Sequence, residues 1–249
     1  ISFEVGVRDL GGHPIYITDA SIGLGSRESV ADASQVLGRY VGLIIIRTFD
    51  QKEVDDIAKY SGVPTINALT DLLHPCQILG DAMTIVEHQG SLDNRAVAYV
   101  GDGANNIANS WINLAARIPL DLRIGTVQNR LPNADILENA KKAGLSKITV
   151  TYDPIEAVKD ADAVYTDVWA SMGEKEKIEE RIKLLRPFQV NDELMSHTKD
   201  TAVFLHCLPA ERGREVTDSI MDGKKSVVFD QAENRLHIQK SIIHWLFEK

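Results

Sequence analysis

Short runs of β-branched and apolar residues alternate with segments of helical periodicity from residue 14 onward, and this alternation constrains the fold more than any other feature of the sequence. The expected strands are residues 15–18, 43–47, 65–67, 97–100, 122–126, 148–151, 163–166, 203–206 and 226–229. The expected helices are residues 29–40, 53–60, 75–89, 106–117, 134–143, 174–185 and 234–247. Continuous apolar strands separated by helices are typical of parallel sheets that are covered by helices on both faces.

Two sheets are favoured over a single large one. The long helix expected at residues 75–89 is followed by the polar stretch 90–95, which is a natural crossing point between two domains. The predicted fold class is therefore α/β with two domains, each a parallel sheet flanked by helices. The first domain is expected to span residues 1–89 and the second residues 90–232, and the terminal helix at 233–249 can return to either domain.

The composition excludes several classes of function. A formal net charge of −9 leaves the chain no electrostatic reason to bind nucleic acid or an acidic membrane. The longest apolar runs, such as residues 41–46, are too short to span a bilayer, and no signal peptide is visible. The two cysteines, Cys76 and Cys207, are too few for a disulfide framework and indicate a reducing compartment. We therefore expect a cytoplasmic protein with no nucleic-acid or membrane partner.

Polar residues at the ends of strands are the candidates for function, because ligands of parallel α/β folds bind beyond the carboxyl ends of the strands. Arg47 ends the strand 43–47, where its guanidinium can donate two hydrogen bonds to an anion, although a surface arginine is an equal alternative. The run His74-Pro75-Cys76-Gln77 opens the helix 75–89. A histidine donor and an amide at the positive end of a helix match a planar group that carries C=O and NH2, whereas a plain helix cap is the more ordinary interpretation of a His-Pro pair alone.

Two further strands end in turns with polar side chains. The turn that begins Gly101-Asp102-Gly103 has Asn106 where a dinucleotide-binding turn requires a third glycine, so a nicotinamide cofactor is disfavoured and a small polar ligand is favoured. Asp167 ends the strand 163–166 and precedes a Ser-Met-Gly loop at 171–173 that could close over an amine, with a helix cap as an equal alternative.

The last strand and the last helix add two more candidates. Cys207 follows the strand 203–206 in a His-Cys-Leu-Pro run, and it is either an inert buried cysteine or a reactive thiol. Arg235 places a second arginine at the beginning of the terminal helix.

Taken together, these motifs closely resemble the ornithine carbamoyltransferase family. They occur in the order Arg47, His-Pro-Cys-Gln at 74–77, Asp167 with Ser-Met-Gly at 171–173, His-Cys-Leu-Pro at 206–209 and Arg235. The resemblance covers essentially the whole chain. The His-Pro-x-Gln motif is shared with aspartate carbamoyltransferases, whereas the Ser-Met-Gly and His-Cys-Leu-Pro runs are the more specific signals and indicate the ornithine branch.

The resemblance implies an enzyme that transfers the carbamoyl group of carbamoyl phosphate to the side-chain amine of L-ornithine, giving citrulline and phosphate, without a metal or an organic cofactor. The residues implied to be catalytic are Cys207, His74 and Arg47. Those implied to bind carbamoyl phosphate are Arg47, His74, Pro75, Cys76, Gln77, Cys207, Leu208 and Arg235. Those implied to bind ornithine are Asn106, Asp167, Ser171 and Met172. The terminal helix is implied to pack back on the first domain, and the protein is implied to be a homo-oligomer, expected to be a trimer.

The beginning of the chain departs from the family pattern. The family's Ser-x-Arg-Thr-Arg phosphate loop is expected directly before Ile1, and the helical spacing of Phe3, Val7 and Leu10 starts without a capping residue. We therefore expect a preceding segment, which could also carry an organelle address. Gly23 stands where many members of the family carry a glutamine that contacts carbamoyl phosphate.

Three alternatives to this activity remain open at the level of sequence. A related transferase could act on putrescine or on an N-acylornithine. A non-catalytic paralogue could only bind ligands or partners. A nicotinamide dehydrogenase is disfavoured by the residue at position 106.

Overall fold

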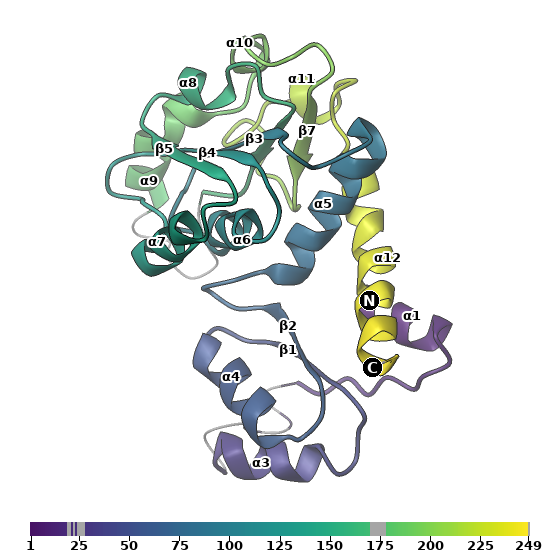
Figure 1. Ribbon diagram of the computed structural model, residues 1–249. Coiled ribbons are helices and arrows are strands. Elements are labelled where there is room, and N and C mark those ends of the chain that lie inside the picture. Colours follow the sequence, from purple (N-terminus) through teal and green to yellow (C-terminus); the bar gives the residue numbers. More distant parts are fainter. Residues whose placement is uncertain (19–20, 22, 24–27, 170–177, 249) are drawn as a thin grey trace. The chain divides into compact units, whose positions relative to one another are not determined.

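The computed structural model describes residues 1–18, 21, 23, 28–169 and 178–248 (Figure 1). Contacts divide the chain into two compact units, of which unit 1 comprises Ile1–Cys76 and Arg235–Lys249 and unit 2 comprises Gln77–Asn234. Two helices, α5 (Pro75–Gln89) and α12 (Val228–Phe247), contribute residues to both units. Each unit contains a parallel sheet with helices around it, which confirms the predicted fold class.

Unit 1 is built on a pair of parallel strands. β1 (Ile44–Arg47) pairs with β2 (Thr65–Leu69), and α4 (Gln51–Tyr60) connects them as a crossover helix. The remaining helices are α1 (Ser2–Asp9) and α3 (Val30–Leu37), and α3 is capped by the Ser29 hydroxyl. The end of α12 completes the core, in which Ile243 packs with Ile66 and Cys76.

Unit 2 is a five-stranded parallel sheet in the order β5-β4-β3-β6-β7. The strands are β3 (Ala96–Val100), β4 (Asp121–Gly125), β5 (Lys147–Thr151), β6 (Ala163–Thr166) and β7 (Val203–His206). The helices are α6 (Asn106–Ala115), α7 (Ala134–Ala143), α8 (Pro154–Val158), α9 (Ile178–Leu185), α10 (Asp192–Met195) and α11 (Asp218–Met221), with a 3-10 turn at Arg186–Phe188.

Alternate residues of these strands supply two separate cores, as the two-residue period of a strand requires. Val97 and Tyr99 of β3 pack with α6 and α7 on one face of the sheet. Ala98 and Val100 pack with the opposite layer, which includes α8 and α10. Helices therefore cover both faces, and the carboxyl ends of all five strands meet at one edge of the sheet (Figure 1).

Two of the expected strands are wrong. Residues 15–18 pair with no strand among the described residues, and Ile15 and Tyr16 are 66% and 86% exposed. At 226–229, Ser226 makes only an isolated bridge, and Val228 already begins α12. Val228 is buried while Phe229 is exposed, because this short apolar run forms the first turn of a helix with one face in the core. Periodicity alone does not separate these two structures in runs of four residues.

Within the described part of the chain, no helix combines the length and the apolar content that a crossing of the bilayer requires.

Candidate active site

Unit 1 places three of the predicted residues around the beginning of α5. Arg47 is the last residue of β1, and His74 directly precedes Pro75, the first residue of the helix. Arg235, from α12, directs a guanidinium nitrogen to Nε2 of His74 at 3.5 Å. Because arginine can only donate, Nε2 of His74 is the acceptor, and the ring proton of the neutral imidazole lies on Nδ1.

His74 is held in its uncharged form. Burial, followed by the charges of Arg235 and Arg47, lowers the pKa of His74 to about 3. The two arginines supply positive charge, and the nearby imidazole of His74 remains a neutral donor. Cys76 has a different environment, since its thiol is buried against the Asn67 carbonyl and burial raises its pKa to about 11. Its side chain belongs to the core of unit 1, so Cys76 can reach a ligand only through its backbone.

The lowered pKa of His74 predicts a pH dependence of folding. An ordinary histidine takes up a proton near pH ~6.5, whereas folded His74 resists it down to about 3. The unfolded state therefore binds the extra proton, and stability is lost as the pH falls below ~6.5. Between pH 7.5 and 5.0, the free energy of unfolding should fall by ~2 kcal/mol more in the wild type than in His74→Asn. Urea unfolding at both pH values measures this difference, and identical pH dependences would contradict it.

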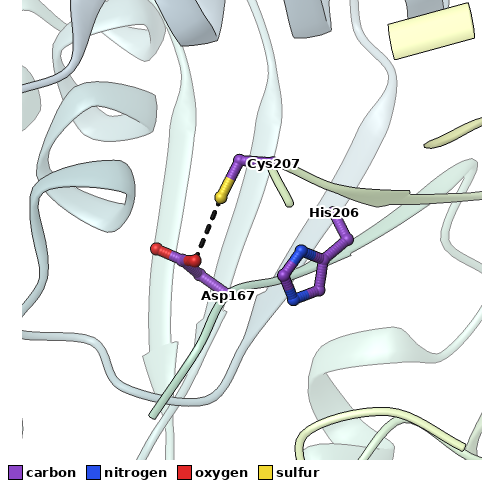
Figure 2. A group of neighbouring side chains, drawn as sticks. All are labelled: Asp167, His206 and Cys207. Carbon is purple, nitrogen blue, oxygen red and sulfur yellow. Dashed lines mark hydrogen bonds between the residues drawn. The ribbon is translucent and has the colours of Figure 1, made fainter. Parts of the chain in front are cut away.

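Unit 2 brings Cys207, Asp167 and Asn105 together at the carboxyl edge of its sheet. Asp167 follows β6 and Cys207 follows β7, and the thiol donates to Oδ1 of Asp167 at 3.0 Å (Figure 2). Asn105 caps α6 and donates its side-chain N–H to Oδ2 of Asp167 at 3.0 Å. The N–H of Val168 donates to Oδ1 at 2.7 Å. Both carboxylate oxygens are therefore oriented by hydrogen bonds.

The electrostatics of this group favour a cation. Burial raises the pKa of Asp167 above its ordinary value, although the hydrogen bonds of Cys207 and Val168 oppose the shift. Burial and the neighbouring Asp167 raise the pKa of Cys207 well above that of a free thiol. Cys207 is therefore a neutral donor, and an ammonium beside Asp167 would stabilise a carboxylate that burial otherwise destabilises.

The histidine of the His-Cys-Leu-Pro run holds the backbone of the run through hydrogen bonds of its ring. The N–H of Leu208 donates to Nδ1 of His206 at 2.9 Å, so the ring proton lies on Nε2, which donates to Oε1 of buried Glu215 at 3.2 Å. Leu208 has a φ of 57°, in the left-handed region that is unusual for leucine. Such strain persists where surrounding contacts hold it, and it commonly marks functional turns.

One oxygen, one ring nitrogen and one sulfur of Asp167, His206 and Cys207 lie within 4.8 Å of one another, which is a possible metal-binding geometry. Figure 2 shows the three side chains. Both His206 nitrogens are engaged by protein groups, however, and the thiol is bonded to Asp167 as a donor. In the structure, the ring of His206 and the thiol of Cys207 are therefore engaged in hydrogen bonds to protein groups.

Gln77 belongs to a buried network in unit 2. Its Nε2 donates to Oδ1 of Asp81 at 2.8 Å, and Gln231 donates to the same oxygen at 2.7 Å. Gln231 also accepts from the N–H of His206 at 2.9 Å. Because a carboxylate only accepts, the Gln77 atom that faces Asp81 is the amide nitrogen.

The structure also shows what sequence reasoning overlooked. Asn105, the neighbour of the predicted Asn106, donates to Asp167, and Asn106 is the first residue of α6. The polar N-cap position just after a glycine turn was the available signal for Asn105. Ser171 and Met172 lie outside the described residues.

Two parallel α/β units with polar side chains at the carboxyl ends of their strands define a two-domain α/β enzyme. The chain belongs to the aspartate/ornithine carbamoyltransferase family: residues 1–87 match the family's carbamoyl-phosphate-binding domain, and residues 93–246 match its aspartate/ornithine-binding domain.

Individual relatives agree with this assignment. The ornithine carbamoyltransferase of Methanocaldococcus jannaschii is 47% identical, with 100% of this chain and 83% of the relative covered. The solved ornithine carbamoyltransferase of Pyrococcus furiosus has a TM-score of 0.92 at 48% identity, over 97% of this chain and 78% of that one. The anabolic enzyme of Campylobacter jejuni has a TM-score of 0.93 at 36% identity, over 99% of this chain and 82% of that one.

Proposed function

We propose that the chain transfers the carbamoyl group of carbamoyl phosphate to the side-chain amine of L-ornithine, yielding citrulline and phosphate. The observation that carries this proposal is the Cys207–Asp167–Asn105 group around the buried Asp167 carboxylate, which fits the cationic end of an amino acid. The match of both family domains and the 47% identity with an ornithine carbamoyltransferase support it.

Residues 1–89 with the terminal helix 233–249 are proposed to bind carbamoyl phosphate. Arg47 and Arg235 provide the positive charge that the phosphate requires, and the backbone at Pro75 and Cys76 lies at the positive end of α5. Neutral His74 donates a hydrogen bond to the carbamoyl oxygen, where negative charge develops during attack. The neutral imidazole donates this hydrogen bond without giving up its ring proton.

Gln77 is proposed to bind the NH2 of the carbamoyl group. The bond to Asp81 holds the amide nitrogen, and the amide oxygen is assigned to the carbamoyl NH2. An amide oxygen can accept a hydrogen bond from the carbamoyl NH2. The backbone of Cys207 and Leu208 would add contacts to the same substrate.

Residues 90–232 are proposed to bind ornithine. Asn106, Asp167, Ser171 and Met172 hold the amino acid, and Cys207 orients the attacking amine. An alkyl amine has a pKa of ~10.4, so freeing it near pH ~7.4 costs ~4 kcal/mol. The raised pKa of Cys207 argues against a standing thiolate as the base, and it favours an orienting role through the hydrogen bond to Asp167.

The enzyme is proposed to act in the cytoplasm as a homotrimer, without a cofactor, and to serve arginine biosynthesis. Related proteins from Pyrococcus furiosus and Campylobacter jejuni carry the name anabolic ornithine carbamoyltransferase. Large exposed apolar side chains in unit 1, including Tyr40 and Phe49, are the kind of surface that an oligomer covers.

Citrulline formation from carbamoyl phosphate and ornithine by the purified full-length protein tests the proposal. We expect turnover with ornithine, and far less with putrescine or N-acetylornithine. Preference for either of those amines would replace ornithine as the substrate. Binding of ligands without turnover of any amine would favour a non-catalytic paralogue.

A further inference from the structure

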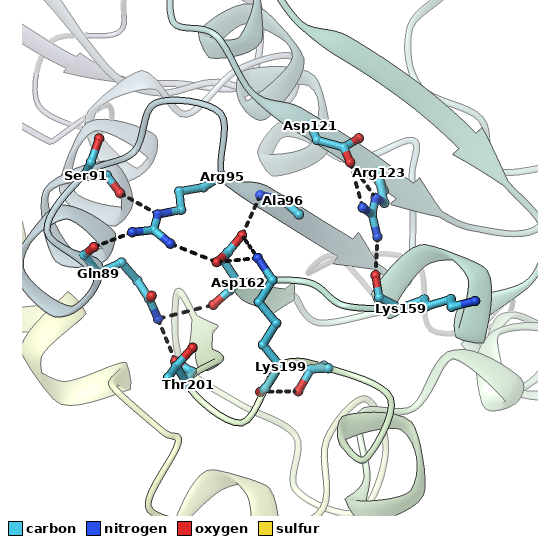
Figure 3. A network of polar contacts seen from close by, with 11 residues as sticks. Gln89, Ser91, Arg95, Ala96, Asp121, Arg123, Lys159, Asp162, Lys199 and Thr201 are labelled. Carbon is cyan, nitrogen blue, oxygen red and sulfur yellow. Dashed lines mark hydrogen bonds and ion pairs between the residues drawn. The ribbon is translucent and has the colours of Figure 1, made fainter.

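Strand β3 carries a part-buried Arg–Asp ion pair at each end. At its amino end, Arg95 donates to Asp162 at 3.0 Å (Figure 3). At its carboxyl end, Arg130 donates to both oxygens of Asp102, at 2.8 and 2.6 Å. The burial is almost identical, with side-chain exposures of 30% and 3% for Arg95 and Asp162 and of 29% and 4% for Arg130 and Asp102. Only the second pair lies at the edge of the sheet that holds Asp167 and Cys207.

The Asp102–Arg130 pair joins two turns of the sheet. Asp102 also accepts from the N–H of Ala104 at 3.0 Å, which fixes the turn after β3. Thr126, just after β4, accepts from the N–H of Gly103 and donates to the carbonyl of Arg130, both at 3.0 Å. The turn after β3 is thus held on two sides by the turn after β4.

The glycines show how little freedom this turn has. A Cβ on Gly103 would lie 2.7 Å from the carbonyl oxygen of Arg130. Gly101 has a φ of 134°, and a Cβ there would lie 3.2 Å from the indole nitrogen of Trp169, two residues after Asp167. The backbone approaches both neighbours as closely as the absence of a side chain allows.

The turn ends at Asn105, whose amide donates to Asp167. We propose that Arg130 is a positioning residue for the ornithine site. Its bidentate bond to Asp102 fixes the conformation of the turn, and the turn directs the Asn105 amide to Asp167. The orientation of Asp167 in turn fixes the position of the Cys207 thiol. This inference rests on the proposed ornithine-binding role of Asp167.

Arg130→Met tests the inference, with Arg95→Met as the matched control. Each variant removes one arginine of nearly equal burial from an end of the same strand. We expect Arg130→Met to raise KM for ornithine about 10- to 100-fold with little change in KM for carbamoyl phosphate, because small displacements of positioning groups have effects of this size. Arg95→Met should lower the melting temperature but leave both KM values within about twofold of the wild type.

A coupling measurement separates positioning from general destabilisation. Asn105→Ser keeps an oxygen for the helix cap but removes the N–H that reaches Asp167. If Arg130 acts through Asn105, Arg130→Met should raise KM for ornithine much less in the Asn105→Ser background than in the wild type. Arg130→Lys should restore the KM for ornithine only in part, because an ammonium cannot form the bidentate hydrogen bonds that a guanidinium makes to a carboxylate.

Equal effects of Arg130→Met and Arg95→Met on KM for ornithine, or fully additive effects of Arg130→Met and Asn105→Ser, would overturn the inference. If the wild type itself formed no citrulline, the proposed function would fail instead, so the two failures are distinguishable.

Discussion

Replacing Asp167 with asparagine is expected to lower kcat/KM for ornithine by roughly 10²- to 10⁴-fold, the loss that follows when one partner of a buried charge pair is removed. Asp167 is buried, and its carboxylate is oriented by Cys207, Asn105 and Val168. Burial raises its pKa, so the bound α-ammonium of ornithine stabilises the charged carboxylate. An asparagine has nearly the same shape but no charge to offer.

A matched control for Asp167→Asn exists at the other end of the same strand. Asp162 directly precedes β6 as Asp167 directly follows it, and both are buried. Although burial acts against it, hydrogen bonds from Ala96, Lys199 and Arg95 hold the pKa of Asp162 below its ordinary value. Asp162→Asn should therefore destabilise the fold and leave kcat/KM for ornithine close to wild type.

Steady-state kinetics with ornithine and putrescine complete this test. Putrescine lacks the α-amino and α-carboxylate groups, so wild type should prefer ornithine by several orders of magnitude, since buried polar groups left unpaired discriminate strongly. Asp167→Asn should shrink that preference. Unaltered ornithine kinetics in Asp167→Asn, or a wild-type preference for putrescine, would defeat the substrate assignment.

The contrast between Asp162 and Asp167 shows what sequence could and could not predict. The rule that ligands bind beyond the carboxyl ends of parallel strands selected Arg47, Asp167 and Cys207. It needs only the direction of each strand, which the chain itself provides. Structure places each of these residues directly at the carboxyl end of its strand.

Features that depend on pairing between distant segments were not accessible in this way. The bond between Asp102 and Arg130 joins positions 28 residues apart, and no local pattern specifies it. Asn105 was overlooked because its role as the N-cap of α6 depends on a helix boundary accurate to one residue. The expected strand at 15–18 failed for a related reason, since a β-branched run becomes a strand only where a partner strand is available.

Replacing Cys207 with alanine is expected to lower kcat by roughly 10²-fold, the loss typical of removing one hydrogen-bond donor that acts in the transition state. The thiol donates to Oδ1 of Asp167 at 3.0 Å, and its loss removes both one of the donors that orient this carboxylate and the group proposed to orient the attacking amine. KM for carbamoyl phosphate should change little, because the charges proposed to hold the phosphate belong to Arg47 and Arg235. A lower kcat with unchanged donor affinity is the signature of an interaction made mainly in the transition state.

Cys207→Ser distinguishes the two roles that a thiol could have at this position. A hydroxyl can donate to Asp167 as the thiol does, but it ionises far less readily. Because burial and Asp167 raise the pKa of Cys207, we expect the neutral donor to be the active form and serine to recover kcat to within about tenfold of wild type. Serine as poor as alanine would instead require a thiolate that takes the proton of the amine. An unchanged kcat in well-folded Cys207→Ala would leave the thiol with a packing role alone.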